Sequence, residues 1–456
     1  MPPKAWGELL ACPGCQSPLH EDAATLRCGS CAESYPLLDG IPWLLPDPVA
    51  SLGEWKSRLK ALMGRLEADA EELKAELKDA STLPSLTAKR LRKFLQATVE
   101  HRKAIAELLT PLALADGGSY ELNQAMRIKL PQSQSLTGYY SNIHRDWAWE
   151  TGENKAGLDV LDKVLADEAP LGLTLVLGAG ACRLAYDLHR TRRPELTIAT
   201  DINPLMLFAA KRILKGRGVK LYEFPLAPLD LESQAVLRKC SAPASSVPGL
   251  ELVFADALRA PFAAGSFDTV VTPWLVDIVP AELGTLAKAV NALLKPGGRW
   301  LEFGSLAFNH ARHAWNYSLE ETLERVQEAG FAPPSVVRER IPYMHSPASC
   351  HARLETVTAF TAVKEQPVSC DAPYRYLPEW LMRSDVAIPR SQAFESFQVM
   401  HTILAQAVSL IDGRRTLGEL AQAFGAQHGL SPAEAEAAIR GFLIKHHEES
   451  LLGHRH

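Results

Sequence analysis

Short apolar runs alternate with amphipathic stretches in the middle of the chain. Residues 173–177 form one such run, which breaks into Gly178-Ala179-Gly180 and is followed by a helix-like stretch at residues 184–189. A second run, residues 196–200, ends on Asp201. Apolar runs of about 4–8 residues are typical of strands buried on both faces. This order predicts a parallel α/β sheet with a ligand crevice at the carboxyl ends of its strands.

Three later runs extend the predicted sheet. Residues 252–257 carry Asp256 near their end, residues 267–272 precede Asp277, and residues 299–303 follow the sequence Lys-Pro-Gly-Gly. The proline and glycines predict a turn before the last of these strands. Both acids therefore belong to the carboxyl edge of the sheet, where open α/β sheets bind ligands.

Two amphipathic helices are expected before the sheet. The first shows apolar residues in steps of three and four, at positions 55, 59, 62, 66, 70, 73 and 77. Pro84 ends it, and residues 86–109 predict a second helix that is rich in Arg and Lys. Those basic residues are more typical of a helix face exposed to solvent than of a surface that binds an anionic partner. Gly117-Gly118 marks the next boundary.

The composition shifts again from Tyr374 onwards. Thr416 with Glu419, and Ser431 with Glu434, have the spacing of helix-capping boxes, which predicts helices beginning at these points. The last helix is expected to bury Ala435, Ala438, Ile439, Phe442 and Leu443. Residues 451–456 are expected to be a disordered tail.

Length and charge limit the class of protein. The 456 residues suffice for two to four domains, and 48 basic against 53 acidic residues give a net charge of −5. This balance argues against a protein built to coat nucleic acid. No apolar run reaches the roughly 18 residues of a membrane span, and no basic-then-apolar signal opens the chain. We therefore expect a cytoplasmic protein without a membrane partner.

Four of the eight cysteines form two C-x-x-C pairs near the start of the chain, Cys12 with Cys15 and Cys28 with Cys31. Two such pairs facing each other give the tetrahedral thiolate site of a structural zinc ion. Free or paired cysteines are the alternative. A four-thiolate set leaves no open position, so the zinc would stabilise the fold and take no part in catalysis.

The glycine turn narrows the choice of ligand. No Gly-Lys-Ser/Thr follows it, which argues against a P-loop, and Cys182 interrupts the dinucleotide fingerprint. Gly178 and Gly180 with Asp201 fit the S-adenosylmethionine (SAM) site of class I methyltransferases, in which a strand-end acid accepts bonds from both ribose hydroxyls. An ordinary tight turn is the alternative. Arg145 is a candidate for binding the SAM carboxylate, although a structural pairing with Asp146 explains it nearly as well.

Two segments resemble known families. Residues 8–46 resemble the zinc-ribbon activator of tRNA and protein methyltransferases, through the cysteines and the strand 35–44. Residues 139–364 resemble carnosine N-methyltransferase. The second likeness is carried by Arg145-Asp146-Trp147, Glu150-Thr151-Gly152, Gly178-Ala179-Gly180, Arg183-Leu184-Ala185, Met206-Leu207-Phe208, Leu294 to Gly298, Trp300-Leu301, Gly304 and Gly330-Phe331.

The carnosine N-methyltransferase resemblance implies roles for individual residues. Arg145, Gly178, Gly180, Arg183, Asp201 and Asp256 would bind SAM, with Asp256 on the adenine amino group. Asp277 would hold the imidazole of the methyl acceptor, and Asn309, His310 and Tyr343 would line its site. The chain departs from the family at Cys182, which replaces a glycine, and at Asn309, which replaces a histidine. A helix cap is the alternative for Asp277, and core packing is the alternative for Tyr343.

His310 and His313 could instead ligate a metal with His144 or His345, but no His-Glu-x-x-His motif accompanies them. Packing or substrate contact is the preferred interpretation. The C-terminal helices resemble the PqqD-like winged-helix domain, which binds precursor peptides. Similar domains bind DNA, but the acidic residues of the last helix favour a peptide or protein partner.

These observations predict an α/β class I SAM methyltransferase of Rossmann-like topology. Its expected parts are a zinc ribbon at residues 1–48, a helical connector at 49–120, the methyltransferase domain at 121–365 and a PqqD-like domain at 374–450. The predicted activity is methylation of an imidazole nitrogen in a histidine-containing small molecule or peptide. The alternatives are methylation of a ribosomally made peptide docked on the C-terminal domain, and a SAM-binding regulatory scaffold.

Overall fold

The computed structural model describes residues 4–22, 25–115, 135–165, 170–244, 248–369 and 386–452. The chain divides into two compact units, Met1–Pro373 and Tyr374–His456. The predicted boundary at Gly117-Gly118 and the last four residues of the predicted tail lie outside the described residues. Each unit is described by itself.

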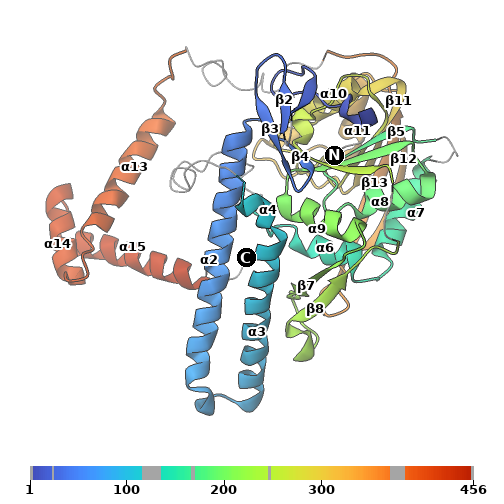
Figure 1. The fold of residues 1–456 in the computed structure, drawn as a ribbon. Helices are drawn as coiled ribbons and strands as arrows, with labels where there is room; N and C mark the ends of the chain where they lie inside the picture. Colours follow the sequence, from blue (N-terminus) through green and yellow to red (C-terminus); the bar gives the residue numbers. More distant parts are fainter. Residues whose placement is uncertain are drawn as a thin grey trace. The chain divides into compact units, whose positions relative to one another are not determined.

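A mixed sheet of eleven strands forms the centre of the first unit (Figure 1). Its order is β1-β2-β3-β4-β9-β6-β5-β10-β11-β13-β12, and pairing is parallel from β4 to β11 and antiparallel elsewhere. The central strands are β5 (Leu173–Leu177), β6 (Leu196–Asp201), β9 (Leu250–Ala255), β10 (Phe267–Pro273) and β11 (Leu294–Gly304). The last two are β12 (Ser335–Tyr343) and β13 (Arg353–Val363). The predicted strands of the parallel sheet are therefore confirmed.

One strand differs from its predicted extent. The Lys-Pro-Gly-Gly segment was expected to be a turn, but it lies within β11, which pairs with β10 from Leu294 onwards. The pairing register shifts between Phe267 and Thr269, and Gly297 has a φ of 74°. The irregularity accommodates the turn-forming residues inside the strand, as in a β-bulge.

Helices cover both faces of the sheet, because its strands are apolar on both sides. Val176 faces one core, which the helices α6 (Tyr140–Trp147), α7 (Glu153–Leu165), α8 (Arg183–Arg192) and α9 (Pro204–Leu214) complete. Its neighbours Leu175 and Leu177 face the other core, which α10 (Leu283–Leu293) and α11 (Leu319–Glu328) complete. The carboxyl ends of the parallel strands lie between these two layers.

Four strands near the start of the chain belong to the same sheet. Strands β1 (Leu19–Asp22), β2 (Thr25–Cys28), β3 (Ser34–Leu38) and β4 (Ile41–Leu44) follow the short helix α1 (Lys4–Gly7). Trp43 of β4 is in register with Phe254 of β9, and their rings lie 4.8 Å apart. The cysteine-rich segment thereby extends the parallel sheet at the β9 edge.

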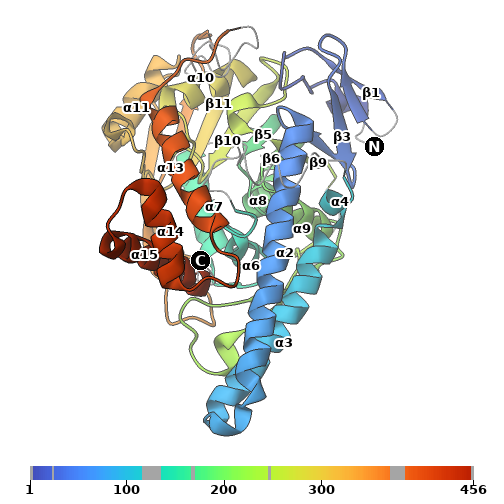
Figure 2. The ribbon, with the colours of Figure 1, turned by 90° about the vertical axis from the view of Figure 1, so that its left-hand side faces the viewer.

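A long helical hairpin follows, in which α2 (Pro48–Lys78) and α3 (Ser85–Leu108) run side by side (Figures 1 and 2). The 3₁₀ turn η1 (Ala80–Thr82) joins them and α4 (Thr110–Ala113) follows. Both predicted helices are confirmed. Trp55 and Leu59 are buried, whereas Leu66, Leu73 and Leu77 nearer the tip are half-buried, so the apolar stripe is covered mainly at its base.

The remaining short elements of this unit are the hairpin of β7 (Val219–Glu223) with β8 (Val236–Cys240) and the 3₁₀ turns η2 (Glu232–Gln234), η3 (Ala257–Arg259) and η4 (His313–Trp315). No helix among the described residues is both long enough and apolar enough to cross a membrane.

The described part of the second unit is helical, with α13 (Gln392–Ser409), α14 (Leu417–His428) and α15 (Pro432–Leu452). Both predicted capping boxes are confirmed: Glu419 N donates to Thr416 Oγ1 at 3.3 Å, and Glu434 N donates to Ser431 Oγ at 3.4 Å. Ala435 and Ile439 are buried as expected, but Ala438 is exposed. The helix packs through the stripe that contains the first two residues, and Ala438 lies beside that stripe.

Candidate active site

The glycine turn joins β5 to α8 in a left-handed backbone conformation. Gly178 has a φ of 68°, and a Cβ there would lie 2.8 Å from Cδ1 of Leu275. Gly180 has a φ of 56°, and a Cβ there would meet nothing within 4 Å. The first glycine is therefore required for packing, whereas the second faces open space. Open space above a glycine turn lets a ligand approach the backbone closely.

Cys182 also adopts the left-handed conformation, with a φ of 65°, although it carries a side chain. Its thiol is buried, and burial raises its pKa well above the ordinary value. A buried thiol with a raised pKa behaves as a small apolar side chain. A cysteine in place of glycine at position 182 therefore strains the backbone, but its buried side chain adds to the packing.

Asp201 connects the end of β6 to this turn. Its Oδ2 accepts from Gly180 N at 2.7 Å and its Oδ1 accepts from Asn203 N at 2.8 Å. Burial raises the pKa of Asp201 to about 6, although the N–H groups of Asn203 and Gly180 favour the charged form. The carboxylate thus fixes the conformation of the glycine turn and keeps lone pairs free for a further donor.

The segment before α7 lies over the turn. Trp147 Nε1 donates to Ala181 O at 2.8 Å, and Arg183 donates to Asp146 O at 2.7 Å. Arg183 also pairs with Asp187 at 2.8 Å, and its guanidinium lies 5.3 Å from the ring centroid of Trp147. The observed contacts of Arg183 therefore hold the protein's own backbone and side chains.

Arg145 is paired within the protein. Its guanidinium lies 2.8 Å from Asp146 and 3.7 Å from Glu153. Burial disfavours the cation, but these two carboxylates outweigh that effect and raise the pKa of Arg145. The structural pairing that the sequence left open is therefore present.

Asp256 follows β9 at the same edge of the sheet. Its Oδ1 accepts from Leu258 N at 2.9 Å and caps the turn η3, and burial raises its pKa. The second carboxylate oxygen has no hydrogen bond to the part of the chain that the structure describes.

Asp277 lies in the turn after β10. Its Oδ2 accepts from Ser305 Oγ at 3.1 Å and from Ala307 N at 3.0 Å. Burial raises its pKa above the ordinary aspartate value. The nearest helix, α10, is capped by Glu282. Asp277 is therefore not a helix cap; it joins the β10 turn to the loop after β11.

The other predicted acceptor-site residues lie around this loop. Asn309 is exposed, and the backbone of His310 exchanges hydrogen bonds with the amide of Asn316, at 2.7 and 3.2 Å. Tyr343 ends β12 and packs on Trp274, with ring centroids 4.6 Å apart. The Arg353 guanidinium lies 4.4 Å from the centroid of the Tyr343 ring.

Three further residues of this edge were not assigned roles from the sequence. Trp274 has a φ of 53°, which is a strained conformation for a bulky residue. Glu302 is fully buried, and one of its carboxyl oxygens has no hydrogen bond among the described residues. Tyr139 precedes α6 and is 36% exposed. The position of Trp274 after a strand end was the only local signal among them.

The four cysteines that could bind a metal ion form a cluster separate from the carboxyl edge of the sheet. Cys12, Cys15, Cys28 and Cys31 place their sulfur atoms within 4.8 Å of one another. Tyr35, which is buried, brings its hydroxyl within 3.2 Å of Cys12 Sγ, as an outer-shell donor to a thiolate would. Within the described residues no other convergent group of His, Cys, Asp or Glu is found, so the histidines around His310 form no such site.

The family comparison agrees with the fold. The family model described as a methyltransferase domain matches residues 175–301, from β5 into β11. Together with the parallel sheet and its glycine turn, this match defines the class of protein, a SAM-dependent methyltransferase. Through a 47-residue stretch the chain also belongs to the UPF0434 family: it is 43% identical to the UPF0434 protein of Methylobacillus flagellatus, over 10% of this chain and 78% of that protein.

Solved structures of methyltransferases match parts of the chain at low identity and with low TM-scores. Phosphoethanolamine N-methyltransferase 2 of Haemonchus contortus is 14% identical over 52% of this chain and 58% of its own, with a TM-score of 0.33. A possible histamine N-methyltransferase of Thermotoga maritima is 17% identical over 50% and 98%, with a TM-score of 0.32. The Haloferax volcanii complex of the Trm112 methyltransferase activator with a putative methyltransferase is 15% identical over 50% of this chain and 97% of its own, with a TM-score of 0.33. The chain spans 58% of the first of these proteins.

We expect one zinc ion per chain in protein purified under reducing conditions, measured by elemental analysis. Cys15→Ser should release it and lower the melting temperature, because metal binding supplies folding free energy to so small a module. The parallel sheet should remain folded, since β9 still pairs with β6. The matched control is Cys350→Ser, an exposed cysteine outside the cluster. Metal content near zero in the unaltered protein would contradict the four-thiolate site.

Proposed function

We propose that the protein transfers a methyl group from SAM to an imidazole nitrogen of a histidine-containing small molecule or peptide. The observation that carries the acceptor assignment is Asp277. It is a half-buried carboxylate at the carboxyl edge of β10, with one oxygen held by the loop after β11. Its other oxygen is available to an N–H donor, and Trp274, three residues earlier in the chain, packs on Tyr343 with the two ring planes tilted by 43°.

The cofactor half of the proposed site suits SAM. Gly180 leaves the space above the turn open, and Asp201 keeps lone pairs for ribose hydroxyls after accepting two backbone N–H groups. Asp256 offers a free carboxyl oxygen for an adenine amino group. Arg145 and Arg183 would act on the cofactor mainly by holding the glycine turn and its cover, because their guanidinium groups are paired within the protein.

The proposed chemistry requires alignment more than acid–base catalysis. SAM supplies an electrophilic methyl group on its sulfonium. Neutral imidazole, with a pKa of about 6.5, is already a nucleophile near pH 7. Asp277 would accept one ring N–H, which fixes the tautomer and directs the other nitrogen's lone pair away from the carboxylate. It would also stabilise the imidazolium that forms, before that proton leaves to solvent. Asn309, His310 and Tyr343 would line the acceptor site.

Product analysis tests this proposal. Purified protein is incubated with SAM and, separately, with L-histidine, carnosine and short histidine peptides, and the products are identified by mass spectrometry. We expect a methyl group on a ring nitrogen. Methylation at another atom, or of none of these acceptors, would refute the imidazole assignment.

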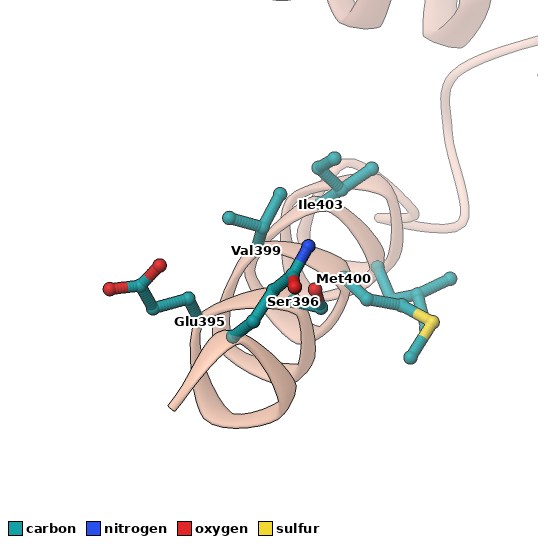
Figure 3. A pocket seen from close by; sticks show the side chains of 7 residues that line it. Glu395, Ser396, Val399, Met400 and Ile403 are labelled. Carbon is teal, nitrogen blue, oxygen red and sulfur yellow. The ribbon is translucent and has the colours of Figure 1, made fainter. Parts of the chain in front are cut away.

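A second candidate is methylation of a peptide docked on the C-terminal unit, which a specific surface favours. A groove along α13 is lined by Gln392, Glu395, Ser396, Val399, Met400, Ile403 and Leu404, and Figure 3 shows Val399, Met400 and Ile403 along this one helix. Several of these apolar side chains are exposed. Deleting residues 374–456 separates the candidates, because an enzyme for free dipeptides should lose little activity.

A regulatory scaffold that binds SAM without turnover remains the non-enzyme alternative, and Cys182 in the glycine turn motivates it. Calorimetry with SAM distinguishes it from a fold without cofactor. Binding without any methylated product would favour the scaffold, and no heat at high micromolar SAM would exclude both the scaffold and the enzyme.

We also propose a cytoplasmic location, since a four-thiolate zinc site suits a reducing compartment.

We expect SAM affinity to rise about tenfold between pH 5 and pH 7. With a pKa of about 6, the ionised fraction of Asp201 grows from about a tenth to about nine-tenths over this range, and only the carboxylate accepts from both hydroxyls. The stability of the ligand-free protein should change in the opposite direction and fall as the pH rises. Because the folded pKa is raised, this group's contribution to stability declines as pH rises from 3.8 towards 6. Calorimetry and thermal melts measure the two trends, and pH-independent binding would contradict the ribose role.

A further inference from the structure

Tyr343 and Arg353 are direct partners in the sheet. Tyr343 is the last residue of β12 and Arg353 is the first residue of β13, and the antiparallel register pairs the two. Directly opposite residues of an antiparallel pair point to the same face of the sheet, so their side chains can meet. The Arg353 guanidinium lies 4.4 Å from the centroid of the Tyr343 ring. This contact places a cation against a residue of the proposed acceptor site.

A series of contacts joins Tyr343 to Asp277. The Tyr343 ring packs on Trp274, with centroids 4.6 Å apart. A Cβ on Gly304, at the end of β11, would lie 3.0 Å from Trp274 Cα. The next residue, Ser305, donates its hydroxyl to Asp277 at 3.1 Å. Two consecutive residues therefore hold Trp274 and Asp277, and the aromatic pair links Asp277 to the cation on β13.

The protein itself uses only part of the Arg353 guanidinium. Its Nε lies 3.2 Å from a carboxylate oxygen of Glu355, in an ion pair whose Arg353 side chain is 57% exposed. Ion pairs with this degree of exposure add little to stability. Within the described part of the chain the guanidinium makes no hydrogen bond, so its N–H donors are available to a ligand.

A second arginine acts on the same ring but is already paired. Burial raises the pKa of Tyr343, and the positive charges of Arg145 and Arg353 oppose that effect. The Arg145 side chain is 14% exposed and lies 2.8 Å from Asp146 and 3.7 Å from Glu153. Arg353 is therefore the guanidinium beside Tyr343 that can bind an incoming anion.

We propose that Arg353 binds the carboxylate of the methyl acceptor, so that the enzyme selects imidazoles that carry a carboxylate over imidazoles that lack one. This inference rests on the proposed function. Arginine binds a carboxylate through two parallel N–H donors, and contact with an aromatic ring restricts the orientation of its planar group. With the imidazole at Asp277, an extended dipeptide adds about 3.5 Å per residue, which is comparable to each ring contact between Trp274 and Arg353.

Three pairs of acceptors that differ in the carboxylate test this proposal. They are L-histidine with histamine, carnosine with β-alanylhistamine, and Gly-Gly-His with its C-terminal amide. Steady-state methylation gives KM and kcat for each acceptor. We expect Arg353→Leu to raise KM for the carboxylate-bearing member by about ten- to thirtyfold and for its counterpart by less than about twofold. Selectivity in the first two pairs only would indicate a free small molecule, and selectivity in the third would indicate a peptide C-terminus.

Glu355→Gln should have the opposite effect, because Glu355 competes with the acceptor for Arg353. We expect it to lower KM for carboxylate-bearing acceptors by about two- to threefold, as for the loss of one exposed ion pair. A side chain that only supported the fold would raise KM instead when its partner was removed.

The matched control is Arg340→Leu, which removes an exposed arginine of β12 whose side chain alternates to the face opposite Tyr343. It should leave the ratio of KM values within each pair unchanged. SAM calorimetry on every variant checks that the cofactor site remains folded. Equal effects on both members of each pair in Arg353→Leu, or no effect, would overturn the carboxylate contact. Failure of the unaltered protein to methylate any of these acceptors would instead refute the proposed function itself.

Discussion

Replacing Asp277 by Asn is expected to lower kcat by about a hundredfold or more, with SAM affinity changed by less than about twofold. The substitution preserves size, and the amide oxygen can still accept from Ser305 Oγ and Ala307 N. What is lost is the charge that would stabilise the imidazolium and fix its tautomer. The measurement is steady-state methylation of the acceptor found by product analysis, together with SAM calorimetry.

Ser305→Ala provides the matched control for Asp277→Asn. It removes one of the two bonds that hold the carboxylate but leaves the charge in place, so a loss of only a few-fold is expected. Similar losses in both variants would mean that Asp277 serves the loop after β11 and not the acceptor. Turnover in Asp277→Asn equal to that of the unaltered protein would remove the chemical support for the imidazole assignment.

Asp201→Ala should weaken SAM binding by about ten- to a hundredfold, which corresponds to roughly 1.5–3 kcal/mol for a charge-assisted hydrogen bond. The structure adds a second reason for a large effect. The same carboxylate holds Gly180 N at 2.7 Å and Asn203 N at 2.8 Å, so its removal also frees the glycine turn. Calorimetry with SAM measures the change.

Asp230→Ala is the control for the lost backbone bonds, because Asp230 accepts from Ser233 N at 2.8 Å in the exposed segment before β8. It should leave SAM affinity unaltered. Asp201→Asn separates the two effects further, since its amide oxygen can keep one backbone bond without the charge. An unchanged dissociation constant in Asp201→Ala would limit Asp201 to a structural role.

The local elements of the fold followed from local chemistry. The apolar run that became β5 could be recognised because a strand buried on both faces leaves no polar alternation. The starts of α14 and α15 were confirmed because a capping box satisfies orphan N–H groups with residues three positions apart. The strand-end positions of Asp201 and Asp256 followed from the same elements, whereas their contacts with SAM remain predictions.

Other features depended on residues far apart in the chain. The sequence left two partners open for Arg145, and only the packing of α6 against α7 brings Glu153 beside the Arg145–Asp146 pair. A helix cap was the alternative that the sequence left open for Asp277, until the loop after β11 proved to supply its donors. For both Arg145 and Asp277, the local sequence allowed either of the two roles.

The sequence by itself determined the strands, the helix starts, the glycine turn and the four-cysteine cluster, because each depends on residues within a few positions or on a short repeat of spacing. Only the tertiary structure decided that β4 joins β9 in one sheet and that Trp274 packs on Tyr343. The physical reason is that burial and electrostatics act through distance in space. A carboxylate or an aromatic ring acquires its role from neighbours that approach it only after the sheet and its helices have packed.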